Sequence, residues 1–199
     1  MNNPLGLYIH VPFCRGKCPY CDFYSLLPDR EIIEEYTQKI CSLLEKAGGI
    51  YNTVYFGGGT PSVLGGDRIA QILSFVNHTS DCEITVECNP YDCASGGFDF
   101  NKIAKSGVNR VSLGLQSADD CERRALGRRS SARDVGAAVN YAKESGITNI
   151  SLDLMLGIPH QTIQSLMESV DFCFESGATH ISAYMLKIEP GTRFFETRD

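Results

Sequence analysis

The stretch GLYIHVPFCRGKCPYCDF, residues 6–23, joins an apolar, β-rich run to three closely spaced cysteines. Cys14, Cys18 and Cys21 follow a CxxxCxxC spacing, which places three thiols on one short loop. A structural zinc site wants four ligands, and iron–sulfur clusters are also usually held by four cysteines. The loop is therefore expected to bind a metal cofactor that keeps one coordination position open.

Two cofactors are alternatives for this loop. A zinc ion would need a fourth ligand from His10 or from a distant cysteine such as Cys88 or Cys93. That interpretation gives no role to the glycine-rich and acidic residues found farther along the chain. We therefore expect a [4Fe–4S] cluster in which one iron is free to bind another molecule.

Apolar, β-rich runs like residues 6–11 recur along the chain and alternate with segments that have helical periodicity. The expected strands are residues 6–11, 53–58, 83–88, 110–116, 149–156 and 180–186. Apolar residues spaced three or four apart predict helices within residues 29–49, 67–78, 99–107, 132–146 and 162–177. The first helix has Asp29 as its expected N-cap and Gly48 as its expected stop.

This alternation predicts an α/β fold with a parallel sheet and outer helices, curled into a partial (β/α)6 TIM-like barrel. A full eight-unit barrel takes about 250 residues, so the 199 residues suffice for about six units. We expect residues 1–199 to form a single domain that ends just beyond the sixth strand. Its last strand would then be an open edge of the sheet.

Composition narrows the class of protein. The formal net charge of −6 offers no general attraction to nucleic acid. No apolar run approaches the ~20 residues of a membrane span, and no signal peptide is visible, so a cytoplasmic location is expected. Nine cysteines would then be mostly reduced. The run RRALGRR, residues 123–129, is expected to be largely the solvated end of a helix.

Polar and glycine-rich residues follow the end of each expected strand. They are the cysteine loop, Gly57–Ser62, Glu87 with Asn89, Gln116, Asp153, and the segment 186–192. In parallel α/β barrels the reactive groups come from the C-terminal ends of the strands. The sequence therefore predicts one site at this end of the sheet.

Six blocks in order carry a resemblance that spans Leu7 to about Thr192. They are LYIHVPFCRGKCPYCDFYS, VYFGGGTPS, ITVECNP, RVSLGLQS, LGRRSS and ISLDLMLGIPHQT. Together they resemble the radical SAM superfamily, and within it the oxygen-independent coproporphyrinogen III oxidase group. The likeness is strongest to the HemW-type heme chaperone branch of that group.

The resemblance implies that Cys14, Cys18 and Cys21 bind a [4Fe–4S] cluster whose fourth iron chelates S-adenosylmethionine (SAM). Reduction by the cluster would cleave SAM to methionine and a 5′-deoxyadenosyl radical. The other implied cofactor-binding residues are Tyr8, Tyr20, Gly58, Gly59, Thr60, Glu87, Gln116, Arg128, Asp153 and Lys187. Among the four arginines of residues 123–129, the resemblance separates Arg128 from its neighbours, which are still expected to be solvated.

One departure decides between branches of the group. The oxidase has a further cysteine two residues after the third, where this chain has Phe23. The chaperone branch is thus favoured, with coproporphyrinogen III oxidase as the alternative enzyme. The implied partners are heme or coproporphyrinogen III, an electron donor such as flavodoxin or ferredoxin, and proteins that accept heme. The family's C-terminal domain is expected to be absent from this chain.

Overall fold

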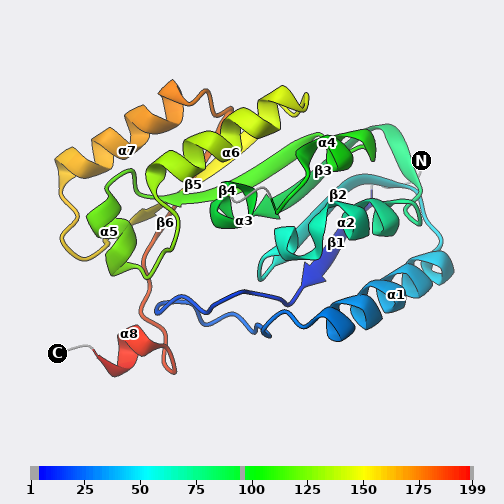
Figure 1. Ribbon diagram of the computed structural model, residues 1–199, viewed down its shortest axis with the longest axis horizontal. Coiled ribbons are helices and arrows are strands. Elements are labelled where there is room, and N and C mark those ends of the chain that lie inside the picture. The colour runs from blue at the N-terminus through cyan, green and yellow to red at the C-terminus, as the bar shows by residue number, and fades with distance from the viewer. Residues whose placement is uncertain (1–4, 95–96, 198–199) are drawn as a thin grey trace.

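The chain forms a parallel six-stranded sheet with helices packed against it, as a computed structural model shows for residues 5–94 and 97–197 (Figure 1). The strands follow one another across the sheet in chain order. They are β1 (Gly6–Val11), β2 (Tyr51–Gly58), β3 (His78–Cys88), β4 (Arg110–Gln116), β5 (Asn149–Leu156) and β6 (His180–Met185). The predicted fold class is confirmed, and the sheet stays open with β1 and β6 at its edges.

Each expected helical segment contains a helix. They are α1 (Arg30–Ala47), α2 (Gly65–Leu73), α4 (Phe100–Lys105), α6 (Ala132–Glu144) and α7 (Ile163–Glu175). The Asp29 side chain caps α1 by accepting from the Glu31 and Ile32 amides, and Gly48 follows its end with a positive φ of 49°. Four short helices were not predicted: η1 (Pro61–Leu64), α3 (Pro90–Ala94), α5 (Asp120–Ala125) and α8 (Arg193–Glu196).

The boundary between α2 and β3 differs from the prediction. The helix ends at Leu73, and β3 begins at His78 rather than at Glu83. Strand β2 pairs Tyr51 with His78, and the register then shifts so that Thr53 pairs with Glu83. This irregularity lengthens β3 at its start, where the apolar pattern that continues from the helix gave no sign of a strand.

The two faces of the sheet differ in chemistry because side chains alternate along each strand. One face is apolar and packs against the helices; it includes Val54, Phe56, Ile84, Val86, Val111, Leu113, Leu115, Ile150, Leu152 and Leu154, all buried. The other face carries Glu87, Ser112, Gly114, Asp153 and Ser182, which the strand register places side by side. The hydrophobic core therefore lies between sheet and helices, and the polar face is left for a site.

The loop after β1 is closed at its base. The Cys14 amide donates to the Leu26 carbonyl at 3.0 Å, and the Leu26 amide donates to the Pro12 carbonyl at 2.7 Å. Farther out, the Phe194 amide of α8 donates to the Pro19 carbonyl at 3.0 Å. A small apolar cluster supports this end of the loop; it contains Leu126, Met155, Ile158, Tyr20, Leu186 and Phe194.

None of the helices within the described residues is long and apolar enough to cross a membrane.

Candidate functional site at the C-terminal ends of the strands

A cavity of about 570 Å³ opens at the C-terminal ends of the strands, over the polar face of the sheet. Eleven of the residues predicted for the site line it: Cys14, Cys18, Cys21, Tyr20, Gly58, Gly59, Thr60, Glu87, Gln116, Arg128 and Asp153. They come from the cysteine loop, from the ends of β2 to β5 and from the turn after α5. The fold thus gathers residues as far apart in the sequence as Cys14 and Asp153 around one space.

The three cysteines are free thiols, and each is half-buried at the cavity wall. Cys14 Sγ lies 3.3 Å from Thr60 Oγ1, and Arg128 Nη1 lies 3.9 Å from Cys18 Sγ. Burial raises the pKa of Cys21, and the neighbouring thiols of Cys18 and Cys14 add to this effect. Negative charge on the Cys21 sulfur is therefore disfavoured unless a cation is present, and a bound metal cofactor would supply one.

The donor set suits an iron–sulfur cluster. Three thiols on one loop supply soft ligands, and the rest of the cavity leaves room for a second molecule beside them. Among the described residues, no group of three or more His, Cys, Asp or Glu side chains is placed to hold a single metal ion. His10, which a zinc site could have used, has its Nδ1 3.3 Å from the Tyr8 hydroxyl.

The glycine-rich loop after β2 packs tightly on the cysteine loop. The Gly59 amide donates to the Val11 carbonyl at 2.8 Å. A Cβ at Gly59 would lie 2.7 Å from the Phe13 carbonyl oxygen, closer than such atoms can approach. The preceding Gly58 has a φ of 112°, which side chains rarely allow. Glycine is therefore required at 59 by contact between the two loops and at 58 by the backbone conformation, and the contact places Thr60 beside Cys14.

Two half-buried carboxyls face the cavity from β3 and β5. Glu87 accepts from the Tyr55 hydroxyl at 2.7 Å and from the Gly58 amide at 3.2 Å. Burial raises the pKa of Glu87, and the nearby charge of Asp153 raises it further. The two hydrogen bonds lower this pKa but do not cancel the increase. Burial also raises the pKa of Asp153, although Ser112 and Ser182 donate to it. Both carboxylates would be stabilised by a cation or by hydroxyl donors in the cavity.

The substitution Glu87→Gln should change how the stability of the ligand-free chain depends on pH. A carboxyl whose pKa is raised on folding stabilises the fold below its ordinary pKa and loses this contribution as the pH rises through the raised value. Relative to Glu87→Gln, the wild-type free energy of unfolding should fall from about pH 4 toward neutrality, by about 1.4 kcal/mol for each pKa unit gained. Urea unfolding at several pH values measures the difference, and a constant or growing difference would contradict the raised pKa.

An irregularity at the end of β4 positions Gln116. The register with β5 shifts between Gly114 and Gln116, and Gln116 has a φ of 68°. This backbone conformation is uncommon outside glycine and is often found at functional sites. The Tyr184 hydroxyl donates to Gln116 Oε1 at 3.0 Å, so the side chain is held at the cavity wall.

Arg128 reaches the same wall from the turn after α5. Its Nη2 donates to the Gly114 carbonyl at 3.1 Å, while Nη1 faces Cys18. Burial by itself would lower the pKa of Arg128, but Tyr20 and Cys18 nearby raise it above the ordinary value. A Cβ at Gly114 would lie 2.7 Å from Arg128 Nη2. Glycine at that position therefore leaves the space that the guanidinium occupies.

The expectation that the neighbours of Arg128 are solvated is wrong for Arg123. Its side chain is only 1 % exposed. It donates to the carbonyls of Leu115, Ser117 and Ser130, at 3.2 Å for Ser117 and 2.9 Å for Ser130, and to Ser130 Oγ at 2.8 Å. Burial lowers the pKa of Arg123 to about 10, so the side chain is still charged at neutral pH. Because two of these carbonyls flank Gln116, Arg123 supports the irregular end of β4.

Comparison with known proteins decides the family. Residues 8–173 match the description of the Radical SAM superfamily. The chain belongs to the radical SAM superfamily. It is 36 % identical over 205 residues to "Heme chaperone HemW" of Haemophilus influenzae, covering 96 % of this chain and 53 % of that protein. It is also 34 % identical to "Radical S-adenosyl methionine domain-containing protein 1, mitochondrial" of Bos taurus, covering 96 % of this chain and 45 % of that protein. The chain thus spans about half the length of these relatives.

Solved structures agree on the fold. The coproporphyrinogen III oxidase HemN of Escherichia coli superimposes with a TM-score of 0.81 at 24 % identity, over 94 % of this chain and 45 % of that one. Streptococcus suis SuiB bound to S-adenosylmethionine gives a TM-score of 0.66 at 20 % identity, over 96 % and 42 %. Membership of the superfamily implies a [4Fe–4S] cluster and SAM as cofactors, in agreement with the donor set in the cavity.

Two residues predicted from the resemblance do not line the 570 Å³ cavity. Tyr8 on β1 is 56 % exposed and stacks beside Tyr55, with 6.0 Å between ring centroids. Lys187 is exposed beyond the end of β6 and forms an ion pair with Glu189. Their predicted roles at the cofactor stay predictions.

Several cavity residues were not predicted. They include Tyr55, Arg110, Ser112, Ser182 and Tyr184, together with Phe23 and Ser25 of the cysteine loop. Tyr55, Ser112 and Ser182 pair across the sheet with the predicted Tyr8, Glu87 and Asp153. Arg110 and Tyr184 lie two positions from Ser112 and Ser182 on the same strands. Alternation along each strand was the signal that could have found them.

Proposed function

We propose that Cys14, Cys18 and Cys21 hold a [4Fe–4S] cluster and that SAM binds beside it in the 570 Å³ cavity. The observation that carries the proposal is the convergence of three free thiols with two carboxyls and a guanidinium on one space. When bound, such a cluster supplies the electron for reductive cleavage of SAM. The residues of the chain bind and orient these molecules.

The polar lining suits the chemical groups of SAM. Glu87 and Asp153 can accept hydrogen bonds from its ammonium and hydroxyl groups, and Arg128 can donate to its carboxylate. Gln116 adds an amide, and Gly58, Gly59 and Thr60 would lie along the methionine end. Tyr20 closes one side of the cavity, with its ring 6.3 Å from that of Phe194.

We further propose that the chain acts in heme metabolism as a heme chaperone, delivering heme to client proteins in the cytoplasm. Two observations support this over a coproporphyrinogen III oxidase. Three proteins named "Heme chaperone HemW" are 36 % identical to this chain over nearly its whole length. At the cavity, Phe23 occupies the position of the oxidase's additional cysteine, and its side chain is 65 % exposed.

Anaerobic reconstitution with iron and sulfide, followed by assays on the same sample, tests the proposal. We expect about four irons and four sulfides per chain, SAM binding by calorimetry, and transfer of bound heme to apo-myoglobin. Binding of one zinc ion with no iron would contradict the cluster. Decarboxylation of coproporphyrinogen III with SAM and a reductant, without heme transfer, would contradict the chaperone and support the oxidase.

A further inference from the structure

The cysteine loop contains a stretch whose position is not fixed by its own backbone. Residues 15–17 lie between the first and second thiols, and within the described part of the chain none of their backbone groups forms a hydrogen bond with another backbone group. The loop is tied before this stretch, where the Cys14 amide donates to the Leu26 carbonyl, and after it, where the Cys21 amide donates to the Cys18 carbonyl at 3.1 Å. The placement of Cys14 relative to Cys18 therefore depends on side-chain contacts.

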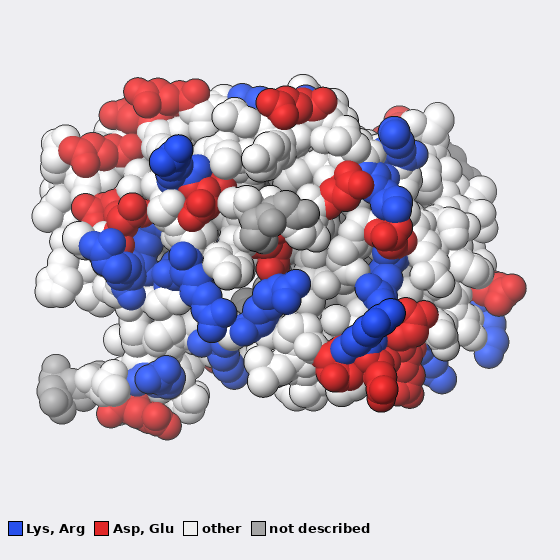
Figure 2. Space-filling model, in the orientation of Figure 1, with Lys and Arg blue, Asp and Glu red and all other residues white. Residues whose placement is uncertain are grey.

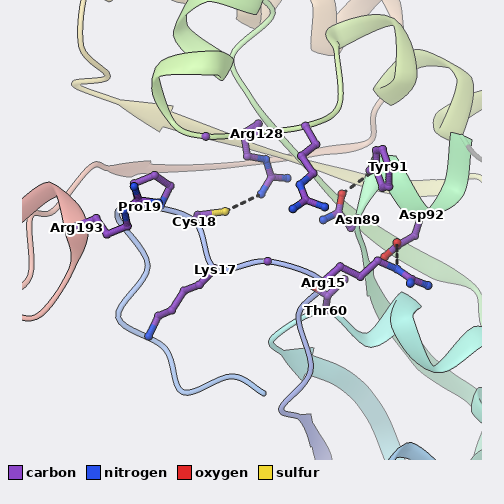
Figure 3. Close-up of a pocket in the computed structure, with 13 residues that line it drawn as sticks. Arg15, Lys17, Cys18, Pro19, Thr60, Asn89, Tyr91, Asp92, Arg128 and Arg193 are labelled. Atoms are coloured by element: carbon purple, nitrogen blue, oxygen red, sulfur yellow. Dashed lines mark hydrogen bonds and ion pairs between the residues drawn. The ribbon is translucent and has the colours of Figure 1, made fainter. Parts of the chain in front are cut away.

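The Arg15 side chain makes such a contact with α3. Its Nε donates to Asp92 Oδ1 at 2.7 Å. In Figure 3, Arg15 extends from the loop to Asp92, whereas Arg128 points toward Cys18. The Asp92 side chain is only 5 % exposed and that of Arg15 is 54 % exposed. The cysteine loop therefore supplies a cation to a carboxylate that is buried in the body of the fold.

Asp92 is held in place by the segments around it. Ser62 Oγ of η1 donates to Asp92 Oδ2 at 3.1 Å and accepts from the Asn89 amide at 3.0 Å. The Asn89 carbonyl accepts in turn from the Asp92 amide at 3.0 Å. Ser62 is also buried. The carboxylate is thus fixed by η1 and by the turn after β3, and Arg15 connects the cysteine loop to that fixed point.

Arg15 is one of several cations near this carboxylate. Figure 2 shows Lys and Arg side chains running across this face of the molecule. A second cavity, of about 250 Å³, lies beside the loop, and its charged lining residues are Arg15, Lys17, Arg128, Arg129, Arg193 and Asp92. Of these cations, within the described residues, Arg15 alone forms an ion pair with Asp92. Because a buried carboxylate that loses its partner is strongly destabilised, this pairing is expected to persist in solution.

We propose that the Arg15–Asp92 pair, which we call the loop latch, holds the stretch between Cys14 and Cys18 in the position that the cluster requires. Asp92 is then a positioning residue, which acts on the site through Arg15, the neighbour of Cys14 in the chain. The inference rests on the proposed function, because it gives the latch a role toward the cluster. With the latch formed, the two thiols stay beside Thr60 and Arg128. With the latch broken, residues 15–17 can move away and let a thiol leave the cluster.

The test breaks the latch from either side and measures how fast the cluster is lost. Arg15→Met and Asp92→Asn are reconstituted anaerobically, and excess EDTA is added while the visible absorption of the cluster is followed. We expect each substitution to raise the rate of loss about fivefold, between the effect of an exposed ion pair and that of a hydrogen bond to a charged group. A rate equal to that of wild type in either variant would overturn the proposal.

The two substitutions change the charge near the cluster in opposite directions, since one removes a cation and the other removes an anion. A purely electrostatic effect on the cluster would therefore speed its loss in one variant and slow it in the other. Loss of the latch speeds it in both. Opposite changes in the two rates would thus overturn the latch and leave Arg15 and Asp92 with a charge effect alone.

Three further variants separate the latch from a general loss of stability. Combining Arg15→Met with Asp92→Asn should speed cluster loss no more than Asp92→Asn alone, because both changes break one contact. Arg15→Lys, which keeps the charge and a donor, should lie closer to wild type than Arg15→Met. Asp67→Asn breaks the exposed ion pair of Asp67 with Lys102, between α2 and α4, and should leave the rate unchanged. Additive effects in the double variant, or equal loss in Asp67→Asn, would contradict the latch.

The unfolding midpoint in urea provides a check on the fold itself. For Arg15→Met it should stay close to the wild-type value, because this side chain is more than half exposed and lies outside the hydrophobic core. A large fall in the midpoint together with faster cluster loss would assign the effect to global instability instead of the latch.

Labelling of the cluster-free chain gives a readout that needs no cofactor. Iodoacetamide should alkylate Cys14, which is half-buried beside Thr60, faster in Arg15→Met and in Asp92→Asn than in wild type. The exposed Cys121 serves as an internal reference that should not change. If the wild-type chain took up no cluster, the proposed function would fail while labelling still tested the latch. Normal cluster uptake with equal labelling and equal cluster loss in all variants would overturn the latch alone.

Discussion

The combined substitution Cys14→Ala, Cys18→Ala and Cys21→Ala should abolish cofactor loading. The three thiols are the soft ligands on the wall of the larger cavity, and among the residues that the structure describes their loss leaves only Cys88 as a cysteine lining it. After anaerobic reconstitution, we expect iron to fall from about four atoms per chain to well under one, with loss of the visible absorption of the cluster. Iron and sulfide analysis and an absorption spectrum measure this result.

Cys121→Ala is the matched control for this prediction. Cys121 is also a free cysteine, but it lies exposed on α5, where Arg124 Nη2 is 2.9 Å from its sulfur. Its replacement should leave the iron content at the wild-type level. Iron retained by the triple variant, or lost equally in Cys121→Ala, would show that the cysteine loop is not the site of the cluster. Circular dichroism of both variants should match wild type, since the loop lies outside the hydrophobic core.

Arg123→Met should cause the largest loss of stability among single substitutions at the edge of the site. Methionine keeps part of the buried volume but leaves the carbonyls of Leu115, Ser117 and Ser130 without this donor. Each buried acceptor left unpaired costs about 1–3 kcal/mol, so we expect a loss of at least about 3 kcal/mol. Urea unfolding of the ligand-free chain measures it as a lower midpoint with little change in slope.

The neighbouring Arg124→Met is the control, because Arg124 is exposed and its only described side-chain partner is the Cys121 thiol. An exposed substitution of this kind should stay within about 0.5 kcal/mol of wild type. Arg123→Lys should be intermediate, because one ammonium cannot reach all of the carbonyls that the guanidinium contacts. An unfolding midpoint for Arg123→Met equal to that of wild type would contradict the support of β4 by this side chain.

The strands and long helices could be predicted because their cause is local. Alternating and three-to-four-residue apolar patterns marked each of them, and Asp29 as N-cap is confirmed by its hydrogen bonds. The start of β3 could not be predicted, since it depends on an irregular pairing with β2. The short helices α3, α5 and α8 have too few residues to show a period.

The site could be predicted in part. Chain order and the rule for strand ends were enough to place Glu87, Gln116 and Asp153 together at one end of the sheet. The sequence could not distinguish the buried Arg123 from the exposed Arg124. Arg123 is buried because it donates to carbonyls beside Gln116, where the pairing of β4 with β5 is irregular, and no local pattern indicates that irregularity. Lys187 follows β6 in sequence, yet the chain turns so that its ammonium meets Glu189.

The closed base of the cysteine loop makes the segment between Cys14 and Leu26 a replaceable module. Phe13 and Leu26 pair just beyond the end of β1, outside the strands of the sheet, so a change of length between them is not expected to alter the strand register. Loop-closure entropy grows slowly, with each doubling of length costing only about 0.6 kcal/mol. We therefore expect this sheet to accept loops with other cysteine spacings at the same two residues without loss of the fold.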